Sequence, residues 1–298
     1  MDKKAALDAL ITSLKQACLG ISRFLRDGEA VSGSVGTSNP FGDAQLKADM
    51  YSDHLLFESI RGLCVTALSE ETPVPQAMGG SYFIVTFDPL DGSSIIDTNF
   101  SVGTMIGIWD SEELIGATGR DLIWSAIVVY GSRTTMLAEE KEDWLAKDLA
   151  GSRVCEYTLR GDQWVKSKDN LRIKRETKLF APANLRAVNE SPGYRALVAY
   201  WMDHGFTLRY TGGMVPDVAQ IFLKGSGVFS NPTTEVSPPK LRILYESGPI
   251  ARLVEAAGGL AYYQGRPVLD VVITGYEQKV GMCVGSAAEV ERFNSLVG

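Results

Sequence analysis

Apolar residues near the start of the chain recur every three or four positions, as they do on one buried face of an α-helix. The pattern predicts a helix over residues 7–25 that ends near the RDG sequence at 26–28. The apolar positions of this face are Leu7, Leu10, Ile11, Leu14, Ala17, Cys18, Ile21 and Leu25. A second helical period at 45–63 contains Leu46, Met50, Phe57 and Ile60. Between the two helices, residues 29–42 are rich in Gly, Ser, Thr and Asn and predict a long irregular loop.

Continuous runs of β-branched and aromatic residues predict strands at 82–87, 102–109 and 124–131, with a hairpin return at 133–140. Residues 148–178, in contrast, are polar and rich in charge. We therefore expect a domain boundary near the end of this segment. The two predicted domains are 1–175 and 176–298.

The second half of the chain alternates between helical and strand-like segments. Helices are expected at 194–205 and at 250–259, where two glycines end the second one. Strands are expected at 268–275 and 279–286. Alternation of this kind in both halves predicts an α/β or layered α+β fold.

Composition narrows the function classes. The chain has 298 residues, of which 45% are hydrophobic and 22% charged, as in a globular protein. Its net charge of −7 argues against nucleic acid as a partner, because binding to phosphate backbones requires a basic surface. The four cysteines show no CxxC spacing, so neither a zinc site nor a disulfide framework is indicated. No signal peptide or membrane span is apparent, so we expect a cytoplasmic protein, or an organellar one if a targeting segment was trimmed.

The sequence FDPLDGSS at 87–94 follows a predicted buried strand and holds two carboxylates. Pro89 restricts the backbone, so we expect a turn that directs Asp88, Asp91 and the Leu90 carbonyl toward one point. Oxygen ligands of this kind suit Mg²⁺. The same residues could instead cap an ordinary turn, and from this motif alone both interpretations stay open.

A glycine and two serines follow directly. If a helix or a nest of N–H groups begins at Gly92, Ser93 and Ser94, its positive end would bind a phosphate. A serine-capped helix start is the simpler interpretation of these three residues taken alone. Beside the acidic turn, however, they could hold a phosphate ester against a metal ion.

Further acidic residues could belong to the same site. Asp43 and Asp49 are six positions apart, which on one straight helix would separate them by about 120°. We therefore place Asp43 just before the helix, at the site, and Asp49 inside the helix, farther from the metal. Taken singly, these two residues and the adjacent Glu70 and Glu71 would be ordinary surface acids.

The motifs GDAQLKAD, SEE, FDPLDGSS, GGMVPDV and KLRILYE occur in this order from about residue 5 to the C-terminus. The set resembles the family of fructose-1,6-bisphosphatases and sedoheptulose-1,7-bisphosphatases. The resemblance implies a sugar phosphatase fold with α/β/α/β/α layers. It also implies Mg²⁺-dependent hydrolysis of the 1-phosphate of a sugar bisphosphate, with Mn²⁺ able to substitute.

The resemblance also implies roles for individual residues. The implied metal ligands are Asp43, Glu70, Asp88, the Leu90 carbonyl, Asp91 and Glu246. Asp49 and Glu71 would orient and deprotonate the attacking water, which makes them the catalytic residues. The implied substrate-binding residues are Gly92, Ser93, Ser94, Asn184, Arg186, Arg209, Tyr210, Lys240 and Arg242. The first domain would hold the metal and the scissile phosphate, and the second the sugar and the distal phosphate.

One arginine of the family crosses to a neighbouring subunit, which makes Arg209 an interface candidate and a homodimer or homotetramer the expected assembly. Within the family, DGSSIIDTNFSVGT, FAPANLR and LRYTGGMVPDV resemble the sedoheptulose enzymes more closely. Ala187 and Asn231 stand where fructose enzymes have tyrosines, so we expect a longer pocket and a preference for sedoheptulose-1,7-bisphosphate. A fructose-1,6-bisphosphatase or a dual-specificity enzyme is the alternative. A weaker alternative is an inositol-phosphate or nucleotide-phosphate phosphatase, against which the KLRILYE motif argues. Another weaker alternative is a catalytically silent sugar-phosphate-binding regulator, against which the complete carboxylate set argues.

Overall fold

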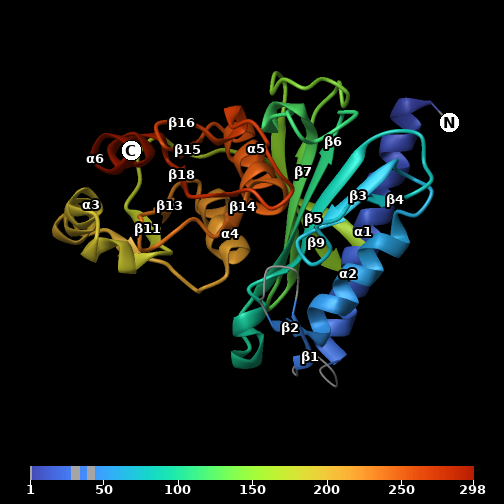
Figure 1. Ribbon diagram of the computed structural model, residues 1–298, viewed down its shortest axis with the longest axis horizontal. Coiled ribbons are helices and arrows are strands. Elements are labelled where there is room, and N and C mark those ends of the chain that lie inside the picture. The colour runs from blue at the N-terminus through green and yellow to red at the C-terminus, as the bar shows by residue number, and fades with distance from the viewer. Residues whose placement is uncertain (1, 28–33, 39–43) are drawn as a thin grey trace.

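The structure is a computed structural model that describes residues 2–27, 34–38 and 44–298. Five layers follow one another across the molecule (Figure 1). The first layer contains the helices α1 (Lys3–Asp27) and α2 (Lys47–Ser59), and an eight-stranded sheet lies beside it. The helices α4 (Met214–Lys224) and α5 (Gly248–Ala256) form the third layer. A six-stranded sheet and the helices α3 (Pro192–Asp203) and α6 (Ala287–Val297) complete the stack.

The eight-stranded sheet has the strand order β10-β9-β8-β7-β6-β5-β3-β4. Its strands are β3 (Thr66–Ser69), β4 (Gln76–Ala77), β5 (Ile84–Asp91), β6 (Val102–Trp109), β7 (Leu122–Tyr130), β8 (Thr134–Glu140), β9 (Arg153–Arg160) and β10 (Gln163–Leu171). All neighbours are antiparallel except β3 and β5, which run parallel. Because β3 and β5 run in the same direction, the residues that follow β3 and those at the end of β5 lie at one edge of the sheet.

The six-stranded sheet has the order β12-β11-β13-β18-β15-β16. Its strands are β11 (Leu179–Pro182), β12 (Thr207–Leu208), β13 (Val228–Asn231), β15 (Leu260–Tyr263), β16 (Arg266–Pro267) and β18 (Met282–Gly285). Two small antiparallel pairs lie outside the large sheets, β1 (Ser34–Ser38) with β2 (Ala44–Leu46) and β14 (Leu241–Arg242) with β17 (Lys279–Val280).

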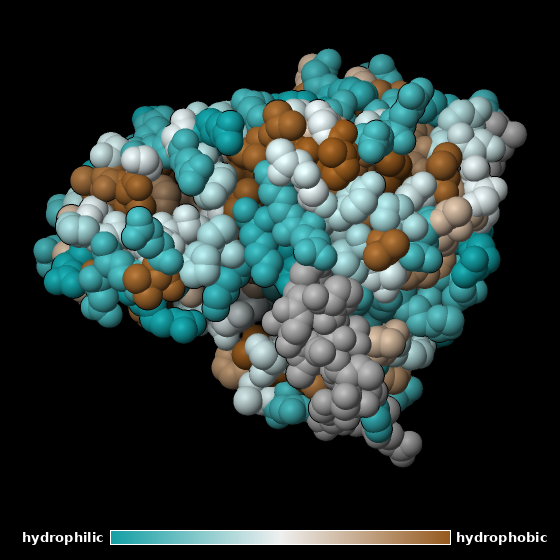
Figure 2. Space-filling model, in the orientation of Figure 1, coloured by the Kyte–Doolittle hydropathy of each residue, from teal (hydrophilic) through white to brown (hydrophobic). Residues whose placement is uncertain are grey.

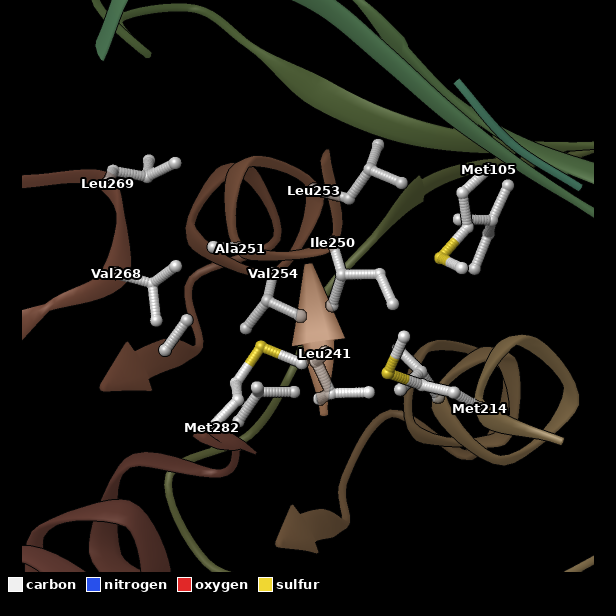
Figure 3. Packing of buried hydrophobic residues seen from close by; sticks show 14 of the residues in the cluster. Met105, Met214, Leu241, Ile250, Ala251, Leu253, Val254, Val268, Leu269 and Met282 are labelled. Atoms are coloured by element: carbon white, nitrogen blue, oxygen red, sulfur yellow. The ribbon is translucent and has the colours of Figure 1, made fainter. Parts of the chain in front are cut away.

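The central strands are buried on both faces, which explains their continuous apolar runs. On β6, Met105 faces α4 and α5, whereas Ile106 belongs to the core under α1 and α2. Figure 3 shows the first of these cores, in which Met105 of the sheet lies close to Ile250 of α5 and Met214 of α4. The helices of the second half of the chain therefore pack directly on the sheet of the first half.

Several predicted elements differ from the structure. The segment 148–178 contains the hairpin β9–β10, which was missed because many of its side chains are exposed at the sheet edge. The strand predicted at 268–275 is wrong, since Val268–Asp270 form a 3₁₀ turn. The helices α4 and α6 were not predicted, and part of the predicted loop at 29–42 is the strand β1.

The second helix has the predicted position, and its predicted apolar face is buried in part: Ile60, just after the helix, has no exposed surface, and Phe57 packs against the core. Met50 is 42% exposed. The buried residues of this helix are Ala48, Asp49, Ser52, Asp53 and Leu56. Acidic and hydroxyl side chains form part of the buried face, and Asp49 among them lines the cavity of the candidate site.

Across the described part of the chain, no helix combines the length and the apolar character needed to cross a membrane. Hydrophilic and hydrophobic residues are interspersed on the molecular face that Figure 2 shows.

Candidate active site

The sequence Asp88–Asp91 is a β-bulge at the end of β5 and not the predicted turn. Asp88 is paired with Met105 and Asp91 with Gly103, so β5 carries one more residue than β6 over this stretch. The Asp88 carboxylate accepts the N–H of Leu90 at 2.9 Å. Pairing with β6 keeps the segment extended, while the bulge turns its side chains toward the edge of the sheet.

Three carboxylates from separate segments meet at this edge. Glu70 follows β3, Asp88 lies on β5, and Glu246 belongs to the π-helical turn Ile243–Ser247. One oxygen from each of them lies within 4.8 Å of the other two. Asp88 and Glu246 are buried, at 4% and 6% exposure. An all-oxygen donor set of this kind fits a hard divalent cation such as Mg²⁺ or Mn²⁺.

Burial and mutual repulsion disfavour the charged forms of these groups. Burial raises the pKa of Asp88 well above its ordinary value, and Glu70, Asp91 and Glu246 raise it further. The pKa of Glu246 is raised by burial and by Glu70, against the opposing effect of Arg242. A bound cation would relieve this repulsion, so the electrostatics of the cluster favour cation binding.

The Arg242 side chain lies against the same cluster. Its guanidinium donates to the Glu70 carboxylate and lies 4.0 Å from Glu246. The Arg242 backbone N–H donates to Glu246 at 2.5 Å. Sequence reasoning assigned this residue to the distal phosphate and did not foresee its place beside the acidic residues.

Asp91 points toward α4. Its carboxylate accepts the Val215 N–H at 2.7 Å, at the positive N-terminal end of this helix. Burial raises the pKa of Asp91 to about 7, although the N–H groups of Val215 and Met214 oppose the shift. The contact needs a glycine at position 103, because a Cβ there would meet the Val215 side chain at 2.3 Å.

A cavity of about 420 Å³ gathers most of the sequence-predicted metal, catalytic and phosphate residues. It is lined by Leu46, Asp49, Glu70, Glu71, Asp88, Leu90, Asp91, Gly92, Ser93, Ser94 and Glu246. Gly92 has a φ of 82°, which favours glycine, and a 3₁₀ turn, Ser93–Thr98, begins after it. Asp43 lies outside the described residues.

The Asp49 carboxyl group is buried and has a raised pKa. It lies in the first turn of α2, is 3% exposed, and accepts the Leu46 N–H at 2.9 Å. Burial raises the pKa of Asp49 to about 7, with further increases from Glu71 and Glu70 and opposing hydrogen bonds from Leu46 and Ser93. A group that titrates near neutral pH, in one cavity with the predicted phosphate-binding residues at 92–94, is suited to accept a proton from water.

The remaining predicted substrate residues lie in the second half of the chain. The Asn184 side chain donates to the Pro232 carbonyl at 3.0 Å, and the Tyr210 hydroxyl donates to Ala183 at 3.3 Å. Burial, Asp217 and Asp91 raise the pKa of Tyr210, whereas Arg186 lowers it. The phenol therefore lies within electrostatic reach of both the Asp91 end of the cavity and the Arg186 guanidinium. Arg186, Arg209 and Lys240 are exposed.

Ala187, one of the two departures from the fructose pattern, lies in the core. Its side chain has no exposed surface and packs with Tyr194 and Trp201 in the core under α3. Asn231, the other departure from the fructose pattern, is half-buried at the end of β13.

Sequence reasoning also missed two buried acids that hold loops of the site. Asp53 accepts hydrogen bonds from the hydroxyls of Ser69 and Thr72, on either side of Glu70 and Glu71. Asp217 of α4 accepts the Thr211 N–H with both oxygens, at 2.9 and 3.1 Å, next to Tyr210. The spacing of four between Asp49 and Asp53 was an available signal, because it places both on one helix face.

Comparisons with known proteins agree with this geometry. Residues 1–143 match the fructose-1,6-bisphosphatase N-terminal domain, and residues 173–298 match the C-terminal domain. The chain belongs to the fructose-1,6-bisphosphatase family. The predicted family and the predicted layered α/β fold are thus confirmed.

Several relatives lie close to this chain. It is 44% identical to the chloroplastic sedoheptulose-1,7-bisphosphatase of Chlamydomonas reinhardtii over 86% of this chain and 64% of the relative. The match to the wheat enzyme of the same name is also 44% and covers 66% of it, so the chain spans slightly less than two thirds of these relatives. A class 1 fructose-1,6-bisphosphatase of Trichlorobacter lovleyi is 32% identical, with 95% of this chain and 88% of the relative covered.

A Toxoplasma gondii crystal structure with a provisional sedoheptulose-1,7-bisphosphatase assignment superposes with a TM-score of 0.90. Its sequence identity is 37%, and the match covers 100% of this chain and 95% of that one.

Proposed function

We propose that this chain is a metal-dependent sugar bisphosphatase that hydrolyses the 1-phosphate of sedoheptulose-1,7-bisphosphate to sedoheptulose 7-phosphate and phosphate. The observation that carries the proposal is the Glu70, Asp88 and Glu246 cluster, which shares one cavity with the glycine-serine turn at 92–94. The higher identity to the chloroplastic sedoheptulose enzymes than to the class 1 fructose enzymes supports the choice of substrate.

The proposed cofactor is Mg²⁺, with Mn²⁺ able to substitute. Its ligands would be the three clustered carboxylates with Asp91, the Leu90 carbonyl and Asp43. Such a cation would neutralise charge that develops on the transferring phosphoryl group and the leaving oxygen.

Residues of the chain itself would perform the remaining tasks. Asp49 and Glu71 hold the attacking water and accept its proton, for which the near-neutral pKa of Asp49 is suited. Gly92, Ser93 and Ser94 bind the scissile phosphate. Its charge is compatible with the site because a bound divalent cation would offset the charge of the nearby carboxylates.

We further propose that the sugar and the distal phosphate bind in the second half of the chain. The residues assigned to this region are Asn184, Arg186, Arg209, Tyr210, Lys240 and Arg242. Charge-assisted hydrogen bonds from arginine and lysine suit a phosphate dianion. Arg209 would act across the interface of a homodimer or homotetramer, as the resemblance to the family implies, and it lies beside the exposed Leu208 of the short edge strand β12.

The domain division at 175/176 remains a proposal. So does a cytoplasmic location, with an organelle as the alternative because the algal and wheat relatives are chloroplastic.

The test compares kcat/KM for sedoheptulose-1,7-bisphosphate and fructose-1,6-bisphosphate at saturating Mg²⁺, with an inositol monophosphate as a third substrate. We expect a preference for the seven-carbon substrate, and Asn231→Tyr should shift it toward fructose-1,6-bisphosphate. Equal or better turnover of the fructose substrate by the native chain would instead favour the dual-specificity alternative, which the class 1 relatives support. Hydrolysis of the inositol phosphate alone would contradict the proposal.

A further inference from the structure

Two buried threonines on adjacent strands each donate a hydrogen bond to a backbone carbonyl beside a proposed metal ligand. Thr104 of β6 donates to the carbonyl of Pro89, between Asp88 and Leu90, at 2.9 Å. Thr86 of β5 donates to the carbonyl of Leu244, two residues before Glu246, at 2.7 Å. Both threonines have no exposed surface.

These two carbonyls lie where regular secondary structure is interrupted. The Pro89 carbonyl belongs to the β-bulge, where the pairing between β5 and β6 shifts by one residue. The Leu244 carbonyl belongs to the π-helical turn, in which Gly248 donates to Ile243 five residues earlier. The corresponding donor for Leu244 would be residue 249, and this residue is a proline without an N–H. The Thr86 hydroxyl therefore replaces the missing backbone donor in the π-helical turn. The Thr104 hydroxyl supplements the interrupted hydrogen-bond ladder at the bulge.

The direction of each hydrogen bond follows from the chemistry of the partners. A threonine hydroxyl has one hydrogen, and a carbonyl can only accept, so both hydroxyl hydrogens are committed to Pro89 and Leu244. The Trp109 indole N–H donates to Thr86 at 2.8 Å. The Tyr130 hydroxyl lies 2.9 Å from Thr104 Oγ1 and must be the donor in that pair. Each chain of bonds thus runs from an aromatic donor through a threonine to a carbonyl.

We propose that Thr86 and Thr104 are positioning residues that hold the two irregular backbone segments of the metal site in place. The acidic side chains of these two segments repel one another before a cation binds. The two backbone segments must therefore be held against moving apart. Both chains of bonds are anchored in the buried centre of the eight-stranded sheet, which supplies this resistance. The inference rests on the proposed function as a metal-dependent hydrolase.

The expected consequence is a loss of metal affinity. Replacing either threonine by valine keeps the shape but removes the donor, and changes of this kind around a metal site weaken binding by about 10- to 100-fold. A purely structural role would lower the stability of the protein without changing the affinity of its folded fraction. The phosphatase activity of the valine variants should be closer to the native activity at saturating Mg²⁺ than at low Mg²⁺.

The experiment measures Mn²⁺ binding to metal-stripped protein by the electron paramagnetic resonance signal of the free ion, without substrate. The variants are Thr86→Val and Thr104→Val, with Thr86→Ser and Thr104→Ser to restore the hydroxyl. The matched control is Thr134→Val on β8, which removes a buried hydroxyl that bonds Ser22 at 2.6 Å on the α1 side of the sheet. We expect weaker Mn²⁺ binding in the valine variants, near-native binding in the serine variants and native binding in the control.

Native Mn²⁺ affinity in both folded valine variants would overturn the inference, as would equal losses in the control. If the valine variants do not fold, Tyr130→Phe still removes the outer donor, and we expect it to weaken binding by about two- to tenfold. Native affinity in that variant would then overturn the Thr104 assignment. Failure of the proposed function is a separate result, because it is measured as the absence of metal-dependent phosphate release by the native chain.

Discussion

Glu246→Gln should stabilise the metal-free protein and inactivate the enzyme. The glutamine keeps an acceptor for the Arg242 backbone N–H, which bonds Glu246 at 2.5 Å, and it has nearly the same volume. The only large change is the loss of one negative charge from a buried cluster. Because the pKa of Glu246 is raised, its charged form is disfavoured in the folded state.

The size of the effect can be worked out from the geometry. Glu246 has two acidic neighbours within 4.8 Å, Glu70 and Asp88, and at an effective dielectric constant near 20 each repulsion is about 3.5 kcal/mol. Arg242, at 4.0 Å, attracts it by about 4 kcal/mol. The balance opposes the charge by about 3 kcal/mol, so the glutamine variant should gain up to this amount at a pH where the native carboxyl is ionised.

The pH dependence has a definite sign. A carboxyl with a raised folded-state pKa contributes stability below its unfolded value, and this contribution is lost as the pH rises through the folded value. The advantage of Glu246→Gln should therefore be largest at high pH and disappear on acidification. Added Mg²⁺ should reverse the order at high saturation, because a ligand at about one thousand times its Kd stabilises the native site by about 4.1 kcal/mol.

Urea unfolding of EDTA-treated protein at pH 8 and pH 5, followed by phosphate release with Mg²⁺, measures both effects. Glu291→Gln is the matched control, since the exposed Glu291 is paired with Arg175 at 2.5 Å and its loss should change the stability little. A metal-free Glu246→Gln protein less stable than the native one at pH 8 would refute the electrostatic reasoning. Unchanged phosphate release would refute the role of Glu246 in the site.

Three further expectations concern the same enzyme. EDTA should abolish phosphate release, and Mg²⁺ or Mn²⁺ should restore it; full activity after dialysis against EDTA would exclude the metal-dependent mechanism. Because the pKa of Asp49 is raised to about 7 and a base must be ionised, kcat should rise with pH through about 7, and Asp49→Asn should lower kcat by about 10²- to 10⁴-fold without unfolding the protein. All four cysteines are buried, so a thiol reagent should label none of them before urea is added and an oxidant should leave the rate unchanged; reversible loss of activity on oxidation would contradict this.

The elements predicted well from the sequence are those in which local pattern and tertiary environment agree. The first helix has one apolar face against the sheet, and the central strands are apolar on both faces because helices cover both. The hairpin β9–β10 lies at the sheet edge, where exposed positions carry polar residues, and its pattern resembled a linker. Periodicity identifies a strand only when at least one of its faces is consistently buried.

The candidate site was partly predictable for a different reason. The set of motifs resembles the fructose-1,6-bisphosphatase family, and this resemblance identified the residues before their geometry was known. The bulge at Asp88 was not predictable, because proline and aspartate locally favour a turn and only pairing with β6 keeps them extended. Likewise, nothing in the KLR sequence indicates that the Arg242 guanidinium donates to Glu70.

The two halves of the chain are joined at the site itself. Asp91 is the last residue of β5, and its carboxylate accepts the N–H of Val215 in the first turn of α4. One turn into the same helix, Asp217 holds the N–H of Thr211 and with it the loop of Arg209 and Tyr210. A displacement of α4 would therefore move a proposed metal ligand and the proposed sugar-binding loop together. A division of the chain near residue 175 separates two sheets, but it cuts through one functional unit, and this explains why helices of the second half pack on the sheet of the first.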